Sequence, residues 1–212
     1  MAYTRGTSAN IIVGAAALFT YDPAAGASEL TEADLPAYVA GTSFRDTLSD
    51  DTDFRNVGYT MNGLEVVFQP DFGEVQVDQL LDVAKLYKQG MQVNLNTAFA
   101  ESTLENLLVA IAAQDSDLTT VSGNPTLALS AGDIGECPVE RGMVAVGPGT
   151  GDCAIGDQIE RVYVAYRALS IENVTVSAKR DEPTMFEVSF RLLPNDAASY
   201  GKIVDRTIPA QS

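Results

Sequence analysis

The feature that most constrains this chain is a repeated alternation of polar and apolar residues, which favours half-buried β-strands. Residues 74–78 read Glu-Val-Gln-Val-Asp, and residues 91–96 read Met-Gln-Val-Asn-Leu-Asn. A period of two places the polar members of each run on one face of a sheet. Residues 173–179 and 184–193 alternate in the same way, as antiparallel strands with one solvated face do. We therefore predict an α+β, mainly antiparallel β protein, a sandwich or partial barrel, with one domain over residues 1–212.

Turn residues divide the rest of the chain into further short elements. Additional strands are predicted over residues 126–129, 143–146 and 160–168, and residues 200–208 form a terminal strand or an arm. Asn62-Gly63 supplies the positive φ angles of a type I′ turn, so residues 56–71 are predicted to be a β-hairpin. Residues 79–89 fit a helical face that ends at Gly90, but they fit irregular structure equally well.

The best helical signal covers residues 102–113. Ser102 and Glu105 have the spacing of a capping box, in which two side chains satisfy backbone N–H groups at the start of a helix. Four apolar residues fall at i, i+3, i+4 and i+7 and form one stripe: Leu104, Leu107, Leu108 and Ile111. A single amphipathic helix among strands is expected to pack this stripe against a sheet.

The first 53 residues contain three segments of different character. Residues 1–9 are expected to be a flexible arm. The apolar run at 11–19 imitates a signal peptide, but only one base precedes it, so we favour a buried first strand over residues 10–20. Residues 22–53 hold eight acids and one base without a sustained period, which predicts a long acidic loop. Phe44 and Leu48 are its apolar anchors.

Composition argues against several kinds of chemistry. The chain has 29 acidic and 13 basic residues and a net charge of −16, whereas affinity for phosphates comes mainly from Lys and Arg. It lacks His, the usual general base and commonest metal ligand. Residues 147–151 lack the Lys-Ser/Thr of a phosphate loop, and residues 46–53 lack the glycine and terminal Glu of an EF-hand loop. We expect no enzymatic activity, no cofactor, no metal and no membrane partner.

One stretch carries a family resemblance. Residues 74–108 contain a strand, a second strand and the start of a helix, with Phe-Ala-Glu-Ser-Thr-Leu-Glu-Asn-Leu-Leu at 99–108. This order and this phrase resemble the tail tube proteins (major tail proteins) of long-tailed bacteriophages. The resemblance is firmest over residues 56–113. It implies a structural virion subunit that forms hexameric rings, and rings that stack into a tube for genome ejection.

The resemblance also implies partners and roles. The subunit would bind copies of itself and other tail proteins at the tube ends, and it would be assembled in the host cytoplasm and reside in the virion tail. Strands of each subunit would join an inter-subunit β-barrel, with residues 79–89 in an extended hairpin, and DNA would pass without specific binding. The lumen-facing residues would be Glu74, Gln76, Asp78, Gln92, Asn94 and Asn96. Phe44 and Leu48 would make inter-ring contacts.

Cys137 and Cys153 flank a glycine-rich segment that is predicted to be a hairpin, so their thiols could meet across its base. An exposed virion permits a disulfide, whereas cytosolic assembly favours two free thiols, and both alternatives stay open. Two other functions also fit the sequence. A soluble β-sandwich binding module, such as an adhesin or a capsid-decoration protein, would use the polar rows as an ordinary solvent face. A carboxylate-based hydrolase would need two converging acids, and nothing marks such a pair.

Overall fold

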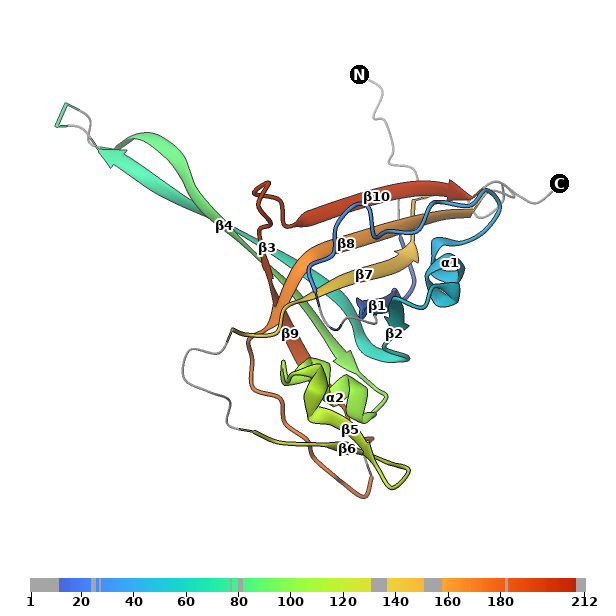
Figure 1. Ribbon diagram of the computed structural model, residues 1–212. Helices are drawn as coiled ribbons and strands as arrows, with labels where there is room; N and C mark the ends of the chain where they lie inside the picture. The colour runs from blue at the N-terminus through green and yellow to red at the C-terminus, as the bar shows by residue number, and fades with distance from the viewer. Residues whose placement is uncertain are drawn as a thin grey trace.

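The fold is a twisted antiparallel sheet with two short α-helices (Figure 1). The computed structural model describes residues 12–23, 26, 28–76, 78–79, 82–130, 137–150, 158–181 and 183–208. The strands are β1 (Ala17–Tyr21), β2 (Phe54–Asn56), β3 (Thr60–Gln76), β4 (Val83–Phe99), β5 (Leu118–Val121), β6 (Asn124–Leu127), β7 (Arg141–Pro148), β8 (Gln158–Ser170), β9 (Phe186–Leu193) and β10 (Gly201–Ile208). The helices are α1 (Phe44–Asp50), α2 (Leu104–Ala110) and the 3-10 turn η2 (Asp115–Asp117). The mainly antiparallel α+β prediction is confirmed, with two α-helices where one was expected.

The central strand of the main sheet is β8. The strand order is β2-β1-β7-β8-β9-β4-β3, and β10 also pairs with β8. Along one edge of β8, β10 pairs with the first half and β9 pairs with residues 167–170. Because two strands share this edge in succession, the sheet divides beside β8 into a β9-β4-β3 arm and the single strand β10.

The longest element is the hairpin of β3 and β4, each 17 residues long. Its turn lies after Gln76, so the hairpin predicted over residues 56–71 is wrong, and residues 83–89 are strand. Asn62 and Gly63 do have positive φ angles, but they sit in a bulge where the β3–β4 register shifts between Met61 and Glu65. The same backbone angles serve a bulge as well as a turn. The end of the hairpin projects well beyond the body of the molecule (Figure 1).

The first hydrophobic core lies between the β9-β4-β3 arm and one face of β1, β7 and β8. Its largest buried members include Leu95, Phe99 and Phe190, and α2 adds Leu108 and Val109. Because α2 follows β4 directly, it lies at the Phe99 end of this core. The alternation of β7 assigns Met143 and Ala145 to this core and Val144 and Val146 to a second core on the opposite face.

The second core is covered by the segment of residues 28–50, which we call the strap. Phe44 and Leu48, both 0% exposed, and Leu30 pack on Phe19 and Val162. The predicted inter-ring role of Phe44 and Leu48 is therefore wrong as stated, because both side chains are already buried within their own subunit. The strap contains α1 at residues 44–50, which departs from the predicted long loop, whereas residues 28–43 contain no helix or strand.

Helix α2 is shorter than predicted, and the side chains that it buries differ in part from the predicted apolar stripe. Thr103, not Ser102, is the N-cap, and its side chain accepts a hydrogen bond from the Asn106 backbone N–H at 3.2 Å. Leu108 is buried and Leu104 and Leu107 are half-buried, but Ile111 is 39% exposed. Asn106 is buried instead, and its amide donates to the carbonyls of Val57 and Glu101.

Other sequence predictions have mixed outcomes. Strands β1, β7, β8, β9 and β10 occupy the predicted regions, although β1 begins only at Ala17, and β6 begins and ends two residues before the strand predicted over 126–129. Residues 173–179 were predicted to be a half-buried strand, but they form no strand, and all of their side chains except Val174 are exposed. Cys137 is exposed, whereas Cys153 and the arm at 1–9 lie outside the described residues. Whether the two cysteines form a disulfide is therefore untested.

Candidate assembly site

A row of polar side chains crosses β3, β4 and β9 on the side of the sheet opposite the first core. Direct cross-strand partners share a face of a sheet, and the register pairs Glu65 with Asn96, Gln69 with Gln92, Asn94 with Arg191, and Asn96 with Ser189. We call this set the polar face: Glu65, Gln69, Gln92, Asn94, Asn96, Ser189 and Arg191. Three of the six residues predicted to face a lumen, Gln92, Asn94 and Asn96, belong to it.

Hydrogen bonds link the polar face into a network. The Ser189 hydroxyl donates to Asn96 Oδ1 at 2.8 Å, and Asn96 Nδ2 donates to Glu65 Oε2 at 3.2 Å. Gln92 Nε2 donates to Asn94 Oδ1 at 3.2 Å. The side chains are thus held in place by one another, and the surface that they present is dominated by amides, which both donate and accept hydrogen bonds.

Glu74, Gln76 and Asp78 are exposed, but the structure does not bring them together with Gln92, Asn94 and Asn96. Glu74 pairs with Leu86, far out on the hairpin. Alternation along β3 places Glu74 and Gln76 on the same side as Phe68 and Phe72, opposite to Gln69. The expectation of one shared row for all six residues is therefore wrong, because Glu74 lies an odd number of positions beyond Gln69.

The other face of the hairpin carries the large apolar side chains, many of them exposed, together with Lys88, Glu74 and Gln76 toward its end. Near the body it carries Val66 and Leu95, which pack against the first core. Farther out, Phe68 is 52% exposed, Phe72 is 54% exposed and Leu86 is 59% exposed. Large contiguous apolar surfaces on soluble proteins mark interaction sites. We call this side of the hairpin the apolar face.

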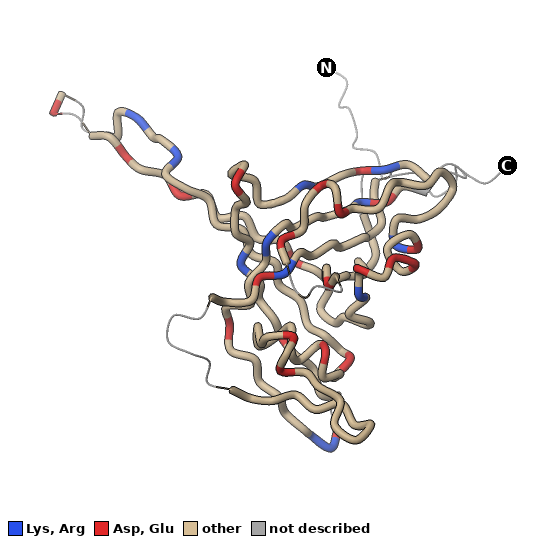
Figure 2. Tube along the Cα trace, viewed as in Figure 1, with Lys and Arg blue, Asp and Glu red and all other residues tan. Residues whose placement is uncertain are grey.

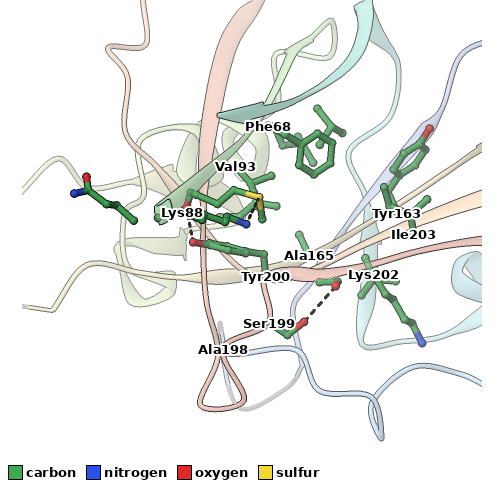
Figure 3. Close-up of a pocket in the computed structure, with 18 residues that line it drawn as sticks. Phe68, Lys88, Val93, Tyr163, Ala165, Ala198, Ser199, Tyr200, Lys202 and Ile203 are labelled. Atoms are coloured by element: carbon green, nitrogen blue, oxygen red, sulfur yellow. Dashed lines mark hydrogen bonds between the residues drawn. The ribbon is translucent and has the colours of Figure 1, made fainter. Parts of the chain in front are cut away.

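An apolar groove of about 620 Å³ opens where the apolar face meets β8 and β10 (Figure 3). Phe68 and Val93 line it from the hairpin, and Tyr163, Ala165 and Ile203 line it from the other two strands. Several lining residues belong to the first core, including Val93, Leu95 and Leu192. The groove is therefore the open end of the first core, at the end opposite α2.

The hairpin also has unpaired strand edges. Within the described residues, β3 pairs with β4 and with no other strand. β4 pairs with β9 only from Val93 to Phe99, so its outer part lacks a second partner among the described strands. Pro70 lies within β3, and proline is confined to edge strands because it cannot donate to a ladder. Unpaired edges are templates for pairing with another chain.

Charge is distributed unevenly along the hairpin (Figure 2). Acidic residues mark its far end, where Asp78 and Asp82 are exposed, and the basic Lys85 and Lys88 follow on β4. The polar face holds one acid, Glu65, and one base, Arg191, but the exposed Asp71 and Glu187 continue the same side of β3 and β9. This side of the sheet is therefore acidic, although not through Glu74 and Asp78 as was expected.

Ion pairs tie the strap to the body beside β10. Glu160 of β8, 5% exposed, accepts hydrogen bonds from the Phe44 backbone N–H at 2.9 Å, the Ser43 hydroxyl at 2.7 Å and Arg206 Nη1 at 2.7 Å. Glu32 of the strap pairs with Lys202 and accepts a hydrogen bond from the Tyr166 hydroxyl at 3.2 Å. The Lys202 ammonium lowers the pKa of the Glu32 carboxyl. Both contacts hold the strap closed over the second core.

Sequence reasoning missed Glu65, Gln69, Phe72 and Ile203 as candidate site residues. The alternation in β3 was visible, but the face to which each residue belongs depends on the strand register, which the sequence does not state. No helix in the described part of the chain is long and apolar enough to cross a membrane. Searches against protein-family models and against curated proteins found no match to this chain.

Proposed function

We propose that the protein is a structural subunit that self-assembles into stacked rings, forming a tube of the kind built by phage tail tube proteins. The observation that supports this most directly is the β3–β4 hairpin, which projects from the body with an unpaired β3 edge and an exposed apolar face. An isolated monomer would leave both features in contact with water. Self-association would pair the β3 edge and cover the apolar face.

Ring formation would provide hydrogen-bond partners for the backbone groups of the unpaired β3 edge. An unpaired edge invites uncontrolled growth unless it is blocked or closed, and a closed barrel has no edge. If each subunit contributes its β3–β4–β9 arm, the β3 edge of one copy would pair with a strand of the next. Such a heterologous contact closes into a ring when the rotation between copies allows it.

The polar face suits the inner wall of such a ring. It lies opposite the first core, so it would stay hydrated after the rings form. Its amides can bind water, and Arg191 on β9 is its one cation. Tight phosphate binding requires several Lys or Arg contacts, so DNA could pass this wall without adhering to it.

The test is the assembly state of the purified full chain. Analytical ultracentrifugation over a wide concentration range is expected to show growth to large species, and negative-stain microscopy is expected to show tubes of uniform diameter with a central channel. A variant with residues 74–86 replaced by Asn-Gly should keep its circular dichroism spectrum, because both cores lie outside that segment, but it should fail to form tubes.

A chain that stays monomeric at every concentration would overturn this proposal. A soluble binding module would then become the better explanation of the apolar groove. Irregular aggregates without a channel would also count against ring formation, since unpaired edges alone produce aggregates. The matched control replaces the β5–β6 turn, Ser122-Gly123, with Asn-Gly, which alters another exposed hairpin and should leave tube formation intact.

A further inference from the structure

The groove and the outer hairpin are two apolar surfaces of one chain that do not cover each other. Ile203 on the wall of the groove is 51% exposed, and Phe68 on the opposite wall is 52% exposed. Phe72 and Leu86 continue the apolar face outward from Phe68 and are still more exposed. The end of the hairpin points away from the body (Figure 1), so it does not fill the groove of its own subunit.

The size and charge of the groove fit a protein segment. Eighteen residues line the groove, and stable protein interfaces use about 20–30 residues on each side. None of the described lining residues is acidic, although the chain contains 29 acids. The far end of the hairpin carries Glu74, Asp78 and Asp82, and a groove without carboxylates would not repel it.

We propose that the groove of one subunit receives the outer hairpin of a second copy, with Phe72 and Leu86 buried against Phe68, Tyr163 and Ile203. This inference rests on the proposed self-assembly and names the surface that receives the hairpin. Buried aromatic anchors in a pocket dominate the energy of most interfaces. The contact is head-to-tail, because the surface that inserts differs from the surface that receives.

Strand geometry gives the offset that this contact imposes between copies. Phe72, which inserts, lies four positions beyond Phe68 of the groove wall along β3, and a strand rises about 3.3 Å per residue, so the offset is roughly 13 Å. A repeated offset of this size would extend the assembly in one direction. The hairpin would therefore join one ring to the next, while the β3 edge would close each ring.

The absence of tryptophan from the chain permits a direct test. Phe72→Trp introduces a single tryptophan at an exposed position of the hairpin. In the monomer its emission should be that of an indole in water and should be quenched strongly by acrylamide. On assembly the emission maximum should shift to shorter wavelength and the quenching should fall, because the indole enters the groove of the next copy.

The groove is tested by adding Ile203→Glu to Phe72→Trp, and the matched control is Ile171→Glu. Ile171 is 47% exposed and lies outside the groove lining, so both variants place the same charge at a similarly exposed isoleucine. Ile203→Glu should abolish the shift and the long tubes while leaving the circular dichroism spectrum unchanged. Ile171→Glu should behave as the parent does.

The outcomes separate this inference from the proposed function. Tubes that form while the introduced indole stays open to acrylamide, or a shift that survives Ile203→Glu, would overturn the groove contact and leave self-assembly standing. A parent protein that never assembles would overturn both. Single rings without stacking in Ile203→Glu would support both, since closure of the ring would then be independent of the groove.

Discussion

At the scale of single residues, the closure of the strap depends on the buried carboxylate of Glu160. Glu160→Ala would leave Arg206, whose side chain is 10% exposed, without its ionic partner, and would remove the acceptor for the start of α1. Breaking a buried ion pair on one side costs about 3–5 kcal/mol. We expect a loss of that order in the free energy of unfolding, measured by urea denaturation.

The neighbouring cross-strand pair supplies the control for Glu160. Arg161 and Asp205 are the next residues on the same two strands, and their ion pair is exposed to solvent. Asp205→Asn should therefore have a much smaller effect than Glu160→Ala, because water screens exposed pairs. Equal losses for the two variants would show that burial does not decide the strength of these contacts.

Glu32 gives the strap a pH dependence. Its pKa is lowered below the usual value near 4.5, first by the hydrogen bond from Lys202. A carboxyl with a lowered folded-state pKa stabilises the fold above its unfolded pKa, and this contribution is lost as the pH falls through the folded value. Wild type should thus be more stable than Glu32→Gln at about pH 6, by no more than about 1 kcal/mol for so exposed a pair. The difference should shrink in urea melts as the pH falls below the usual carboxyl pKa and through the lowered folded-state value, whereas a difference independent of pH would contradict this assignment.

At the scale of secondary structure, α2 provides a comparison within one helix. Leu108 is 4% exposed in the first core, and Ile111, at the C-cap of the same helix, is 39% exposed. Leu108→Ala is expected to cost about 2–5 kcal/mol, because it leaves a cavity in a packed core. Ile111→Ala should cost far less. Chemical denaturation of both variants tests the packing, and a larger loss for Ile111→Ala would mean that the predicted stripe, and not the observed one, is buried.

The elements that sequence reasoning identified are those with a strong local period. β7, β8 and β9 carry long apolar or alternating runs, and each was placed within a few residues. α1 was missed because it spans seven residues, although Ser43 before it and the Phe44–Leu48 spacing are helix signals. The turn was wrongly assigned to Asn62-Gly63. This part of β3 pairs with residues of β4 that lie 31 or more positions later in the sequence, and local patterns do not reveal such distant pairing.

The candidate site was partly predictable for the same reason. Gln92, Asn94 and Asn96 were correctly expected to share a face, since they lie on one strand with no interruption between them. Their relation to Glu74 required the β3–β4 register, which includes three irregularities. A one-residue change of register moves a side chain to the other face. The groove could not be predicted, because it arises where β9 and β10 share one edge of β8.

At the scale of the whole molecule, the proposed tube should pass DNA because its wall lacks an excess of cations. Gln69→Lys adds one positive charge per subunit to the polar face at an exposed position, and the ring repeats that charge. Duplex DNA should then co-sediment with the tubes, and added salt should release it. Thr120→Lys on the exposed strand β5 is the control with the same charge change. DNA bound equally by both variants would show that overall charge, and not the polar face, governs adhesion.

The way in which β4 enters the sheet also has a mechanical consequence. β4 runs from the end of the hairpin into the body, where seven residue pairs, from Val93–Leu192 to Phe99–Phe186, join it to β9. Antiparallel hydrogen bonds lie perpendicular to their strands. Tension along the hairpin would therefore shear all seven pairs at once, whereas a sideways force would peel them apart one by one. A filament linked through such hairpins would resist stretching far better than bending at its joints, a property that suits a conduit that must keep its length while it bends.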